Sequence, residues 1–471
     1  MTDSIPFGTL NHKRQLKGIP CESLLHQDLV SVETVLSTSN VPALVRHWSR
    51  DLGGAILTQP TLLSGVKVGS ALLDLVYAAT LTGQVYALNA ANGAVVWTRT
   101  VPTVQTNCGD FSASGGLVGV IGTPTLDRAN NRMFLTSGDG NLHALNIATG
   151  AELSGWPVQI LDSANAAPRT LVYGSPTLIN GTLYIATASR CDITPYHGQV
   201  VAVSVNSRTV VNRWYPDGAT GPDGGGIWGP GGVSVTAFIP SAPTDYHLYA
   251  LTGNAFATPE NGGYAEHVVR LSPTLQPLAS NTSPPGLADV DFGATPPLFQ
   301  PPNCPGLLAA MQKTGRLFIY NRSAIASGPL QTLQISVPAT YGNFVGQPTY
   351  DPALNRLYLG SPADSSSGTY KHGLIALSVS SSCSFSLAWQ QQIGLNVSGS
   401  DNPVIPPMIA NGVVYYADGG ASQVFAFDAQ SGKQLWTFTT DTKSGVFASP
   451  TVVNGQLFIA GFDHRLYAFG L

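Results

Sequence analysis

The residues of this sequence best suited to chemistry are two carboxylates, an amide, an amine and one isolated indole. Asp192, Asn254 and Lys313 each follow a short apolar run typical of a β-strand, whereas Trp228 and Asp291 precede the next such run. Two carboxylates and an amide oxygen are hard donors of the kind that Ca²⁺ prefers. Without a cation, neighbouring carboxylates repel each other and the pKa of one of them rises. The set therefore predicts a cation site if the chain brings its members together.

Trp228 and Lys313 add the features of a site for a flat ligand. Trp228 lies in the glycine-rich phrase GGGIWGPGG at 224–232, where the backbone can approach a planar molecule closely and the indole can form a stacking floor. The Lys313 amine can neutralise an anionic oxygen on such a ligand. Structural explanations stay open: Asp192, Asn254 and Lys313 also suit turns, and Trp228 also suits a core.

The elements that must position these residues come from a repeated phrase. It reads GQVYALNAANGAVVW at 83–97, GNLHALNIATGAELSGW at 140–156, GQVVAVSVNSRTVVNRW at 198–214 and SQVFAFDAQSGKQLW at 422–436. Alternating apolar positions separated by turn residues predict short antiparallel strands, and a fixed period predicts a propeller. The expected repeat starts are Gln59-Pro60, Thr123-Pro124, Ser175-Pro176, Gly231-Gly232, Thr295-Pro296, Gln347-Pro348, Pro406-Pro407 and Ser449-Pro450.

The two ends of the chain complement each other. The last repeat stops after three expected strands, and VPALVRHW at 41–48 is a Trp-containing strand with no repeat before it. We therefore expect an all-β, eight-bladed β-propeller of four-stranded antiparallel blades, closed by this N-terminal strand pairing with the C-terminal blade. Residues 1–40 are expected to form a lead-in segment, and residues 41–471 a single propeller domain.

Six tryptophans are expected to end the outer strands and to pack between neighbouring blades. The repeats at 231–280 and 292–336 lack this residue. The six are Trp48, Trp97, Trp156, Trp214, Trp389 and Trp436.

The propeller interpretation explains why the chemically suited residues would meet. In an antiparallel blade the loop after the second strand and the segment leading into the next blade lie at the same end. Asp192, Asn254 and Lys313 fall in the first kind of loop, and Trp228 and Asp291 in the second. All five are therefore expected at one mouth of the ring, from three consecutive blades.

Composition narrows the classes of partner and compartment. Only 10% of residues are charged, the formal net charge is −4, and there is no basic run, which argues against a nucleic-acid partner. No apolar stretch reaches the roughly 18 residues of a membrane helix. The low charge favours a periplasmic or extracellular protein, although no signal peptide is visible and a cytosolic location is the alternative. Five cysteines leave at least one free thiol, and their spacing does not fix a pairing.

The repeat resembles that of the pyrroloquinoline quinone (PQQ) dehydrogenases, from about Glu33 to Leu471. The likeness is greatest to the polyvinyl-alcohol-dehydrogenase-like branch of PQQ-binding-like propellers, although non-catalytic outer-membrane assembly propellers share the repeat. It is carried by SRCDITPYHGQVVAV, GGGIWGPGG, TGNAF, DVDFGATP and KTGRLFIYNR.

The resemblance implies a role for each matching residue. Trp228 would lie beneath the quinone ring, with Lys313 at the quinone oxygens, and Asn343 and Cys108 would complete the cofactor-binding set. Asn254 and Asp291 would bind Ca²⁺, with Asp192 near the position of the family's third metal ligand. Asp291 and Lys313 would be the catalytic residues, with Asp291 as the general base.

The sequence also departs from the dehydrogenase pattern. The vicinal disulfide over the quinone is absent and only Cys108 stands in that region, the acidic residue expected before Pro60 is missing, and no CxxCH haem site occurs. The expected function is a PQQ- and calcium-dependent dehydrogenase that oxidises an alcohol or sugar hydroxyl and passes electrons to an external acceptor. The alternative is a non-catalytic propeller that binds a protein or glycan partner across its mouth.

Overall fold

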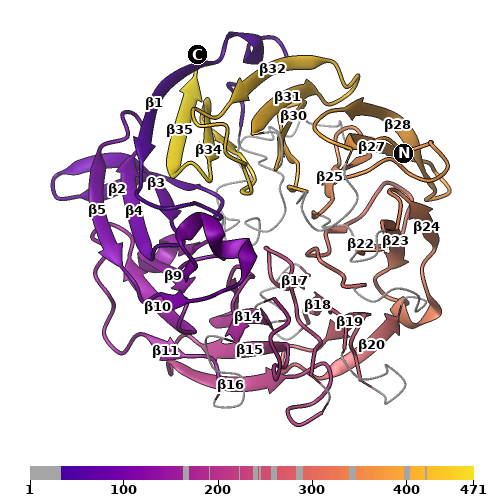
Figure 1. Cartoon of the computed structure of the whole chain (residues 1–471), viewed down its shortest axis with the longest axis horizontal. Coiled ribbons are helices and arrows are strands. Elements are labelled where there is room, and N and C mark those ends of the chain that lie inside the picture. The colour runs from indigo at the N-terminus through magenta and orange to yellow at the C-terminus, as the bar shows by residue number, and fades with distance from the viewer. Residues whose placement is uncertain are drawn as a thin grey trace, which may run out of the picture.

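The chain forms a ring of β-sheets. The computed structural model describes residues 33–162, 169–189, 191–221, 223–236, 242, 245–255, 263–282, 290–338, 346–396, 404–419 and 422–471. Within these residues the strands form eight sheets of four or five antiparallel strands, plus one two-stranded ribbon. Figure 1 shows the sheets arranged around one axis in chain order. The predicted all-β, eight-bladed propeller is confirmed.

The first four blades begin at the predicted repeat starts. Blade 1 consists of β2 (Thr61–Val68), β3 (Ala71–Ala79), β4 (Gln84–Asn89) and β5 (Val95–Thr100). Blade 2 consists of β8 (Thr125–Asp127), β9 (Arg132–Thr136), β10 (Asn141–Asn146) and β11 (Val158–Gln159). Blade 3 consists of β13 (Thr177–Ile179), β14 (Thr182–Ser189), β15 (Gln199–Ser204) and β16 (Thr209–Trp214), with β12 (Thr170–Leu171) added beside β14. Blade 4 consists of β17 (Ser234–Val235), β18 (Leu248–Leu251), β19 (His267–Leu271) and β20 (Pro277–Thr282).

The last four blades follow the same plan. Blade 5 consists of β21 (Leu298–Phe299), β22 (Leu307–Met311), β23 (Arg316–Asn321) and β24 (Gln331–Gln334). Blade 6 consists of β25 (Thr349–Asp351), β26 (Arg356–Ser361), β27 (Gly373–Val379) and β28 (Phe385–Gln392). Blade 7 consists of β29 (Met408–Ala410), β30 (Val413–Asp418), β31 (Gln423–Asp428) and β32 (Gln434–Thr439). Blade 8 consists of β33 (Thr451–Val453), β34 (Gln456–Ala460), β35 (Arg465–Gly470) and β1 (Val45–Asp51).

The remaining elements are short. The ribbon is made of β6 (Val104–Gln105) and β7 (Leu117–Val118). The helical segments of the described residues are the 3-10 turns η2 (Val41–Ala43), η3 (Gly109–Ser114), η4 (Arg128–Asn130) and η7 (Ile325–Ser327). In the described part of the chain we find no helix of the length and apolarity that crossing a bilayer requires.

The ring closes as predicted, by pairing the beginning of the described chain with its end. β1 runs antiparallel to β35, with Val45 opposite Gly470 and Asp51 opposite Arg465. Figure 1 shows the two strands side by side. The strand predicted over 41–48 instead runs from 45 to 51, and residues 41–43 form η2.

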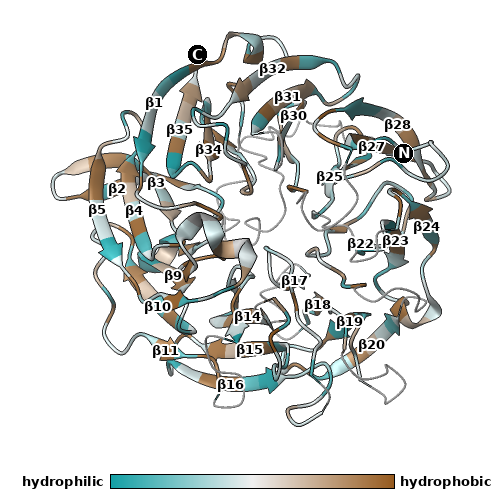
Figure 2. Ribbon diagram, viewed as in Figure 1, coloured by the Kyte–Doolittle hydropathy of each residue, from teal (hydrophilic) through white to brown (hydrophobic). Residues whose placement is uncertain are grey.

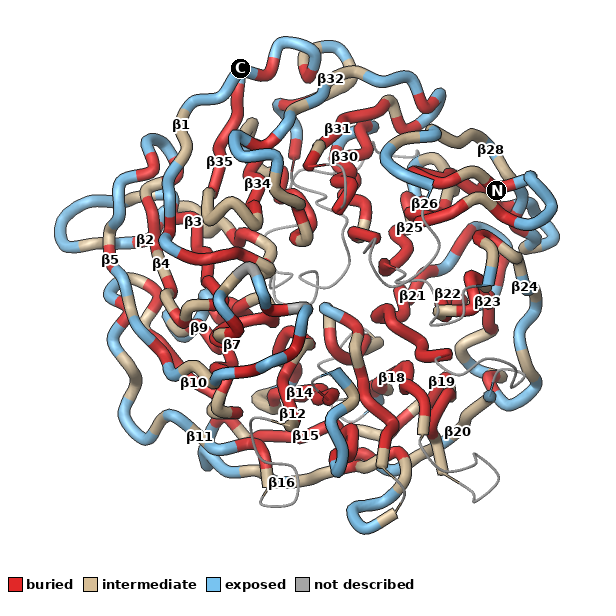
Figure 3. The backbone as a smooth tube through the Cα atoms, in the orientation of Figure 1, coloured by how far each residue is buried: buried red, intermediate tan, exposed pale blue. Residues whose placement is uncertain are grey.

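Buried apolar side chains lie mainly between neighbouring blades. Every junction between adjacent blades has its own buried cluster, including the junction of blades 8 and 1. The inner strands are buried at nearly every position, because a neighbouring blade covers each of their two faces. Figures 2 and 3 show apolar, buried positions on the inner strands and polar, exposed ones on the outer strands and turns.

The repeated phrase has a packing explanation. Trp48, on the outer strand of blade 8, lies against Gly93 of blade 1, where a Cβ would come within 2.7 Å of the indole. Its Nε1 donates to the Ala90 carbonyl at 2.9 Å. The same contact with a glycine of positive φ recurs where Trp97 meets Gly150 and where Trp389 meets Gly432. The Gly and the Trp of the phrase therefore belong to one contact made between successive blades.

Two details of the tryptophan prediction are wrong. β1, β5, β28 and β32 continue for three residues past their tryptophans instead of ending there. Trp156 lies outside a strand, because the following Pro157 has no N–H for the ladder and β11 begins only at Val158.

Candidate functional site

The chemically suited residues lie in loops that the blade topology places at one mouth. Asp192 follows β14, Asn254 follows β18 and Lys313 follows β22, whereas Trp228 and Asp291 precede the first strands of blades 4 and 5. Backbone hydrogen bonds join these loops: Lys313 N donates to Asp291 O at 2.9 Å, and Gly253 N donates to Gly226 O at 2.6 Å. The loops are thereby held to one another as well as to their blades.

Asp291 is the centre of the group and is completely buried. Its Oδ1 accepts a hydrogen bond from the backbone N of Asn254 at 2.7 Å. Its Oδ2 lies 2.7 Å from Lys313 Nζ, whose side chain is 13% exposed. A carboxylate removed from water is stabilised in its ionised form by such charged and backbone donors. Blades 4 and 5 thus hold this carboxylate in a fixed position between a backbone donor and a charged donor.

Two further polar atoms beside Asp291 are buried without a hydrogen-bond partner in the described part of the chain. One is the Asn254 Oδ1 atom, on a residue that is 7% exposed, and the other is Trp228 Nε1. A Cβ at Gly253 would collide with Asp291 Oδ1 and would lie 2.8 Å from Trp228 Nε1, so the indole nitrogen and the carboxylate approach the same glycine. An unsatisfied buried acceptor is costly unless something binds there.

Asp192 is hydrogen-bonded within its own loop, and the charge of Asp291 affects its pKa. Its Oδ1 accepts hydrogen bonds from Ser189 Oγ and Tyr196 Oη, both at 3.0 Å. Burial, followed by repulsion from Asp291, raises the pKa of Asp192, although these hydrogen bonds and Lys313 oppose the rise. Burial and the charges of Asp192 and Asp291 likewise raise the pKa of the Tyr196 hydroxyl.

Glu266 is a third carboxylate of this region, which sequence reasoning missed. It lies just before β19, is 7% exposed, and donates its backbone N to Gly253 O at 2.8 Å. Burial and then the charges of Asp291 and Asp217 raise the pKa of Glu266. Asp291 therefore repels two carboxylates, the partly buried Asp192 and the buried Glu266, with Lys313 as its own ion-pair partner. An isolated acidic residue before a strand carried no sequence signal of this placement.

Tyr173 is the second residue that sequence reasoning missed. Its ring lies 5.1 Å from that of Trp228 and 6.4 Å from that of Phe111. The segment is held there by β12, which pairs with the end of β14. Trp228 thus has Tyr173 as an aromatic neighbour. The only sequence signal for Tyr173 was that it ends the run RTLVY, which lies outside the repeat pattern.

The cysteines form two disulfides among the described residues. Cys108 pairs with Cys191, and Cys304 pairs with Cys383. Cys108 is thus bonded to the residue preceding Asp192 and joins the loop of blade 3 to η3. The assignment of Cys108 to cofactor binding stays a prediction, and Asn343 lies outside the described residues.

The donor set can be compared with the needs of a cation and a quinone. No three His, Cys, Asp or Glu side chains are grouped as a metal site within the described ranges. The Asn254 Oδ1 atom and the Asp291 carboxylate nevertheless fit a hard cation, because the first is an unsatisfied buried oxygen and the second is anionic. The glycines around Trp228 serve close packing within the protein, since a Cβ at Gly226 would lie 2.9 Å from Trp228 Nε1 and one at Gly229 would collide with Thr295 Oγ1; for a flat group the site offers the half-buried indole itself.

Comparison with known proteins places the chain among PQQ-like propellers. The model of the family described as outer membrane protein assembly factor BamB matches residues 36–214 and 384–470, more than half of the chain. A polyvinylalcohol dehydrogenase from Pseudomonas sp. is 24% identical over 243 residues, which are 48% of this chain and 34% of that protein. The match thus spans about a third of the relative's length.

Solved structures share the fold at low sequence identity. A quinohemoprotein alcohol dehydrogenase from Pseudomonas putida has a TM-score of 0.68 at 16% identity, over 94% of this chain and 78% of that one. A europium-containing methanol dehydrogenase has a TM-score of 0.67 at 16% identity, over 96% and 97%. BamB from Moraxella catarrhalis has a TM-score of 0.55 at 14% identity, over 91% and 100%.

Proposed function

Since the chain belongs to the PQQ-like propeller family described as outer membrane protein assembly factor BamB, and since its mouth holds a buried carboxylate beside an unsatisfied oxygen and an indole, we propose that it is a quinoprotein dehydrogenase. The substrate class is an alcohol or sugar hydroxyl, and the electrons leave to an external acceptor. The observation that carries the proposal is the fully buried Asp291, held by Asn254 N and Lys313 Nζ.

Each residue has a stated task in this proposal. Asp291 accepts the proton of the substrate hydroxyl, because it is an anionic base fixed by two donors and screened from bulk water. Lys313 keeps Asp291 ionised between turnovers and faces the anionic oxygens of the ligand. Asn254 Oδ1 and Asp291 would hold Ca²⁺, with Asp192 nearby, and Trp228 would lie beneath the quinone. When bound, the quinone supplies the hydride acceptor and the cation supplies a Lewis acid.

The compartment is proposed on the same basis. Two described disulfides suit an oxidising environment, since thiols stay reduced in the cytosol. This supports a periplasmic or extracellular location, where an external electron acceptor would be needed.

The test is a titration of the purified full chain with PQQ and Ca²⁺. Quenching of Trp228 fluorescence and alcohol-dependent dye reduction should appear together, and the Trp228→Phe variant should lose most of the quenching. Asp291→Asn should lower turnover roughly 100- to 10,000-fold, the range of a lost general base. Absence of both quenching and dye reduction at saturating cofactor would exclude the dehydrogenase.

The ion pair calls for a matched control. Asp291→Asn leaves the Lys313 amine buried without its counter-charge, which lowers stability by about 3–5 kcal/mol for a fully buried pair and less here, because Lys313 is partly exposed. The double variant Asp291→Asn/Lys313→Met removes both charges and should recover most of the melting temperature but none of the turnover. Asp463→Asn, in a turn of blade 8, should retain turnover.

A second function is favoured by one observation, the assembly-factor description of the matching family. In that case the propeller would be a non-catalytic module that binds a protein or glycan across its mouth. This alternative predicts no quenching by PQQ and no effect of Ca²⁺ on the melting temperature.

A further inference from the structure

A second concave site lies between blades 5 and 6. A cavity of about 310 Å³ is lined by residues of β21 and β25, the turns beside them and Arg322, which follows β23. Strands reverse at every turn, so the turn after β23 lies at the end of blade 5 opposite Lys313. None of the five candidate dehydrogenase residues lines the cavity, so a result at one site does not decide the other.

The walls of this cavity are mainly apolar and aromatic. Leu298 and Phe299 line it from blade 5, and Pro348 and Tyr350 from blade 6. The rings of Phe299 and Tyr350 stack across the junction, with centroids 4.8 Å apart and planes at 25°. The volume is roughly twice the ~150 Å³ of an engineered apolar cavity that binds benzene. It therefore has room for a substituted ring.

One cationic side chain, that of Arg322, lines this cavity. Among the described residues, Arg322 makes no ion pair. Its guanidinium lies over Gly306, where a Cβ would collide with Nη2. Partial burial lowers the pKa of Arg322. Asp351, which follows the lining residue Tyr350, is engaged in its own turn, where its carboxylate accepts a hydrogen bond from Ala353 N at 2.8 Å. The planar fork of a guanidinium suits a carboxylate, which it binds through charged, bidentate hydrogen bonds.

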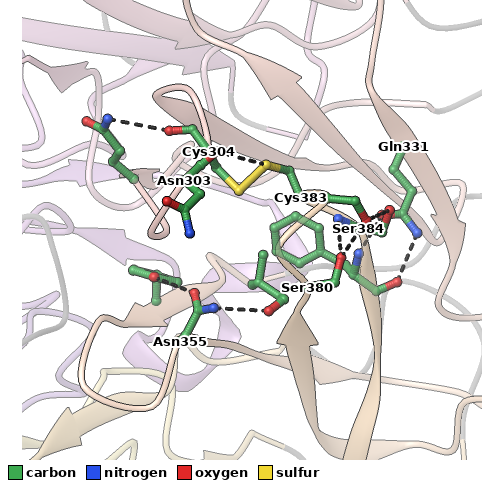
Figure 4. Close-up of a disulfide and its surroundings, with 12 residues drawn as sticks. Asn303, Cys304, Gln331, Asn355, Ser380, Cys383 and Ser384 are labelled. Carbon is green, nitrogen blue, oxygen red and sulfur yellow. Dashed lines mark hydrogen bonds between the residues drawn. A yellow bond between two sulfur atoms is a disulfide. The ribbon is translucent and has the colours of Figure 1, made fainter.

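The cavity is braced on both sides of the blade junction. The Cys304–Cys383 disulfide joins the turn after β21 to the turn between β27 and β28. Gln331 Nε2 donates to Phe385 O at 2.9 Å, and Phe385 N donates to Gln331 Oε1 at 2.7 Å. Figure 4 shows the disulfide with Gln331 and Asn355 around it. Blades 5 and 6 are thus linked covalently and by paired hydrogen bonds, which preorganises the space between them.

We propose that this cavity binds a small organic carboxylate with a ring-sized apolar body. The carboxylate forms a charged, bidentate contact with Arg322, and the ring lies among Leu298, Phe299, Pro348 and Tyr350. Free aromatic acids and peptides that end in Phe both carry such a carboxylate and such a ring.

Calorimetric titration of the full chain with benzoate and with neutral benzamide tests the proposal. Benzoate should bind roughly 10- to 100-fold more tightly than benzamide, the contribution of a charge-assisted hydrogen bond. Equal binding of the two, or no binding of either at millimolar concentration, would overturn it. A short peptide ending in Phe, compared with its amidated form, distinguishes a peptide terminus from a free acid as the source.

Variants assign the binding to this cavity. Arg322→Gln should remove the preference for benzoate, whereas Arg316→Gln, on the same blade but outside the cavity lining, should retain it. If Arg322→Gln does not fold, the anomalous signal of bound 4-iodobenzoate locates the site. Iodine between β21 and β25 supports the proposal, and iodine only elsewhere contradicts it.

Discussion

Two regions of the ring differ in what the repeat provides. The junctions of blades 8, 1 and 2 keep the repeated Trp–Gly contact, whereas the loops of blades 3 to 5 hold the candidate site residues. At the first junctions Trp48 and Trp97 pack on Gly93 and Gly150 of the next blade, and their indole N–H groups donate to backbone carbonyls at 2.9 Å. The outer strands of blades 4 and 5, β20 and β24, contain no tryptophan. The site residues Asn254, Asp291 and Lys313 belong to these two blades.

This comparison indicates that, in a ring of repeats, the contacts that stabilise the fold and the residues suited to chemistry can lie in different parts of the ring. Each blade contacts only its neighbours, so the stability of the ring is spread over many similar junctions. A blade that lacks one of the repeated contacts can then hold buried charges that would be too costly in a small fold. Trp228 illustrates this separation, because it is the one tryptophan outside the repeated position and its Nε1 has no partner among the described residues.

The largest expected effect compares two tryptophans. Trp97→Ala removes a buried ring at the junction of blades 1 and 2 and should lower the free energy of unfolding by about 3–5 kcal/mol. Trp228→Ala should cost much less, because this ring is half-buried with an unsatisfied N–H, but it should abolish PQQ quenching. Urea unfolding of both variants measures the difference. Equal losses would mean that Trp228 is an ordinary core residue.

A pair of glycines gives the next largest effect. Gly93 and Gly53 both have positive φ, at 69° and 73°, but only a Cβ at Gly93 would meet an indole, whereas nothing lies within 4 Å of one at Gly53. Both alanine variants should lose about 1–2 kcal/mol from the left-handed backbone. Gly93→Ala should lose a further ~1–3 kcal/mol from overpacking against Trp48. Similar unfolding free energies for the two variants would argue against the Trp–Gly contact as a determinant of stability.

The smallest effect concerns pH at the mouth. The pKa of Glu266 is raised on folding, so folding favours its protonated form. The resulting stabilisation is complete below the ordinary carboxyl pKa and is lost as the pH rises through the folded-state pKa. Glu266→Gln should therefore raise the melting temperature at pH 7, and the gain should shrink towards pH 4. A gain that is independent of pH would show that burial and the charge of Asp291 do not raise the pKa of Glu266.

Much of the fold follows from the sequence because its signals are local and repeated. The small-residue and Pro starts, such as Thr123-Pro124 and Ser449-Pro450, mark first strands, and β8 and β33 begin directly after them. The orphan strand near Trp48 also predicts the ring closure. Trp156 lies outside a strand, contrary to the prediction, because the following Pro157 has no N–H to donate to the β-ladder.

The candidate site was less accessible to sequence reasoning. Loop topology predicts that Asp291, Asn254 and Lys313 approach one another, but no local pattern predicts that Asp291 and Lys313 form a direct ion pair. Glu266 and Tyr173 enter the region through tertiary packing and through β12, a strand outside the four-strand plan. The pairing of Cys108 with Cys191 likewise depends on which loops the ring brings together.

The pairing of β1 with β35 also sets the order of folding. Both disulfides join segments about 80 residues apart, with sequence separations of 83 and 79, so each can form once its two blades have emerged. The ladder of blade 8 instead joins the first described strand to the last. Contacts of such long separation form slowly, because a large loop must close first. Blade 8 therefore completes after the others, and until then the outer edge of β35 is open to pairing with another copy of the chain.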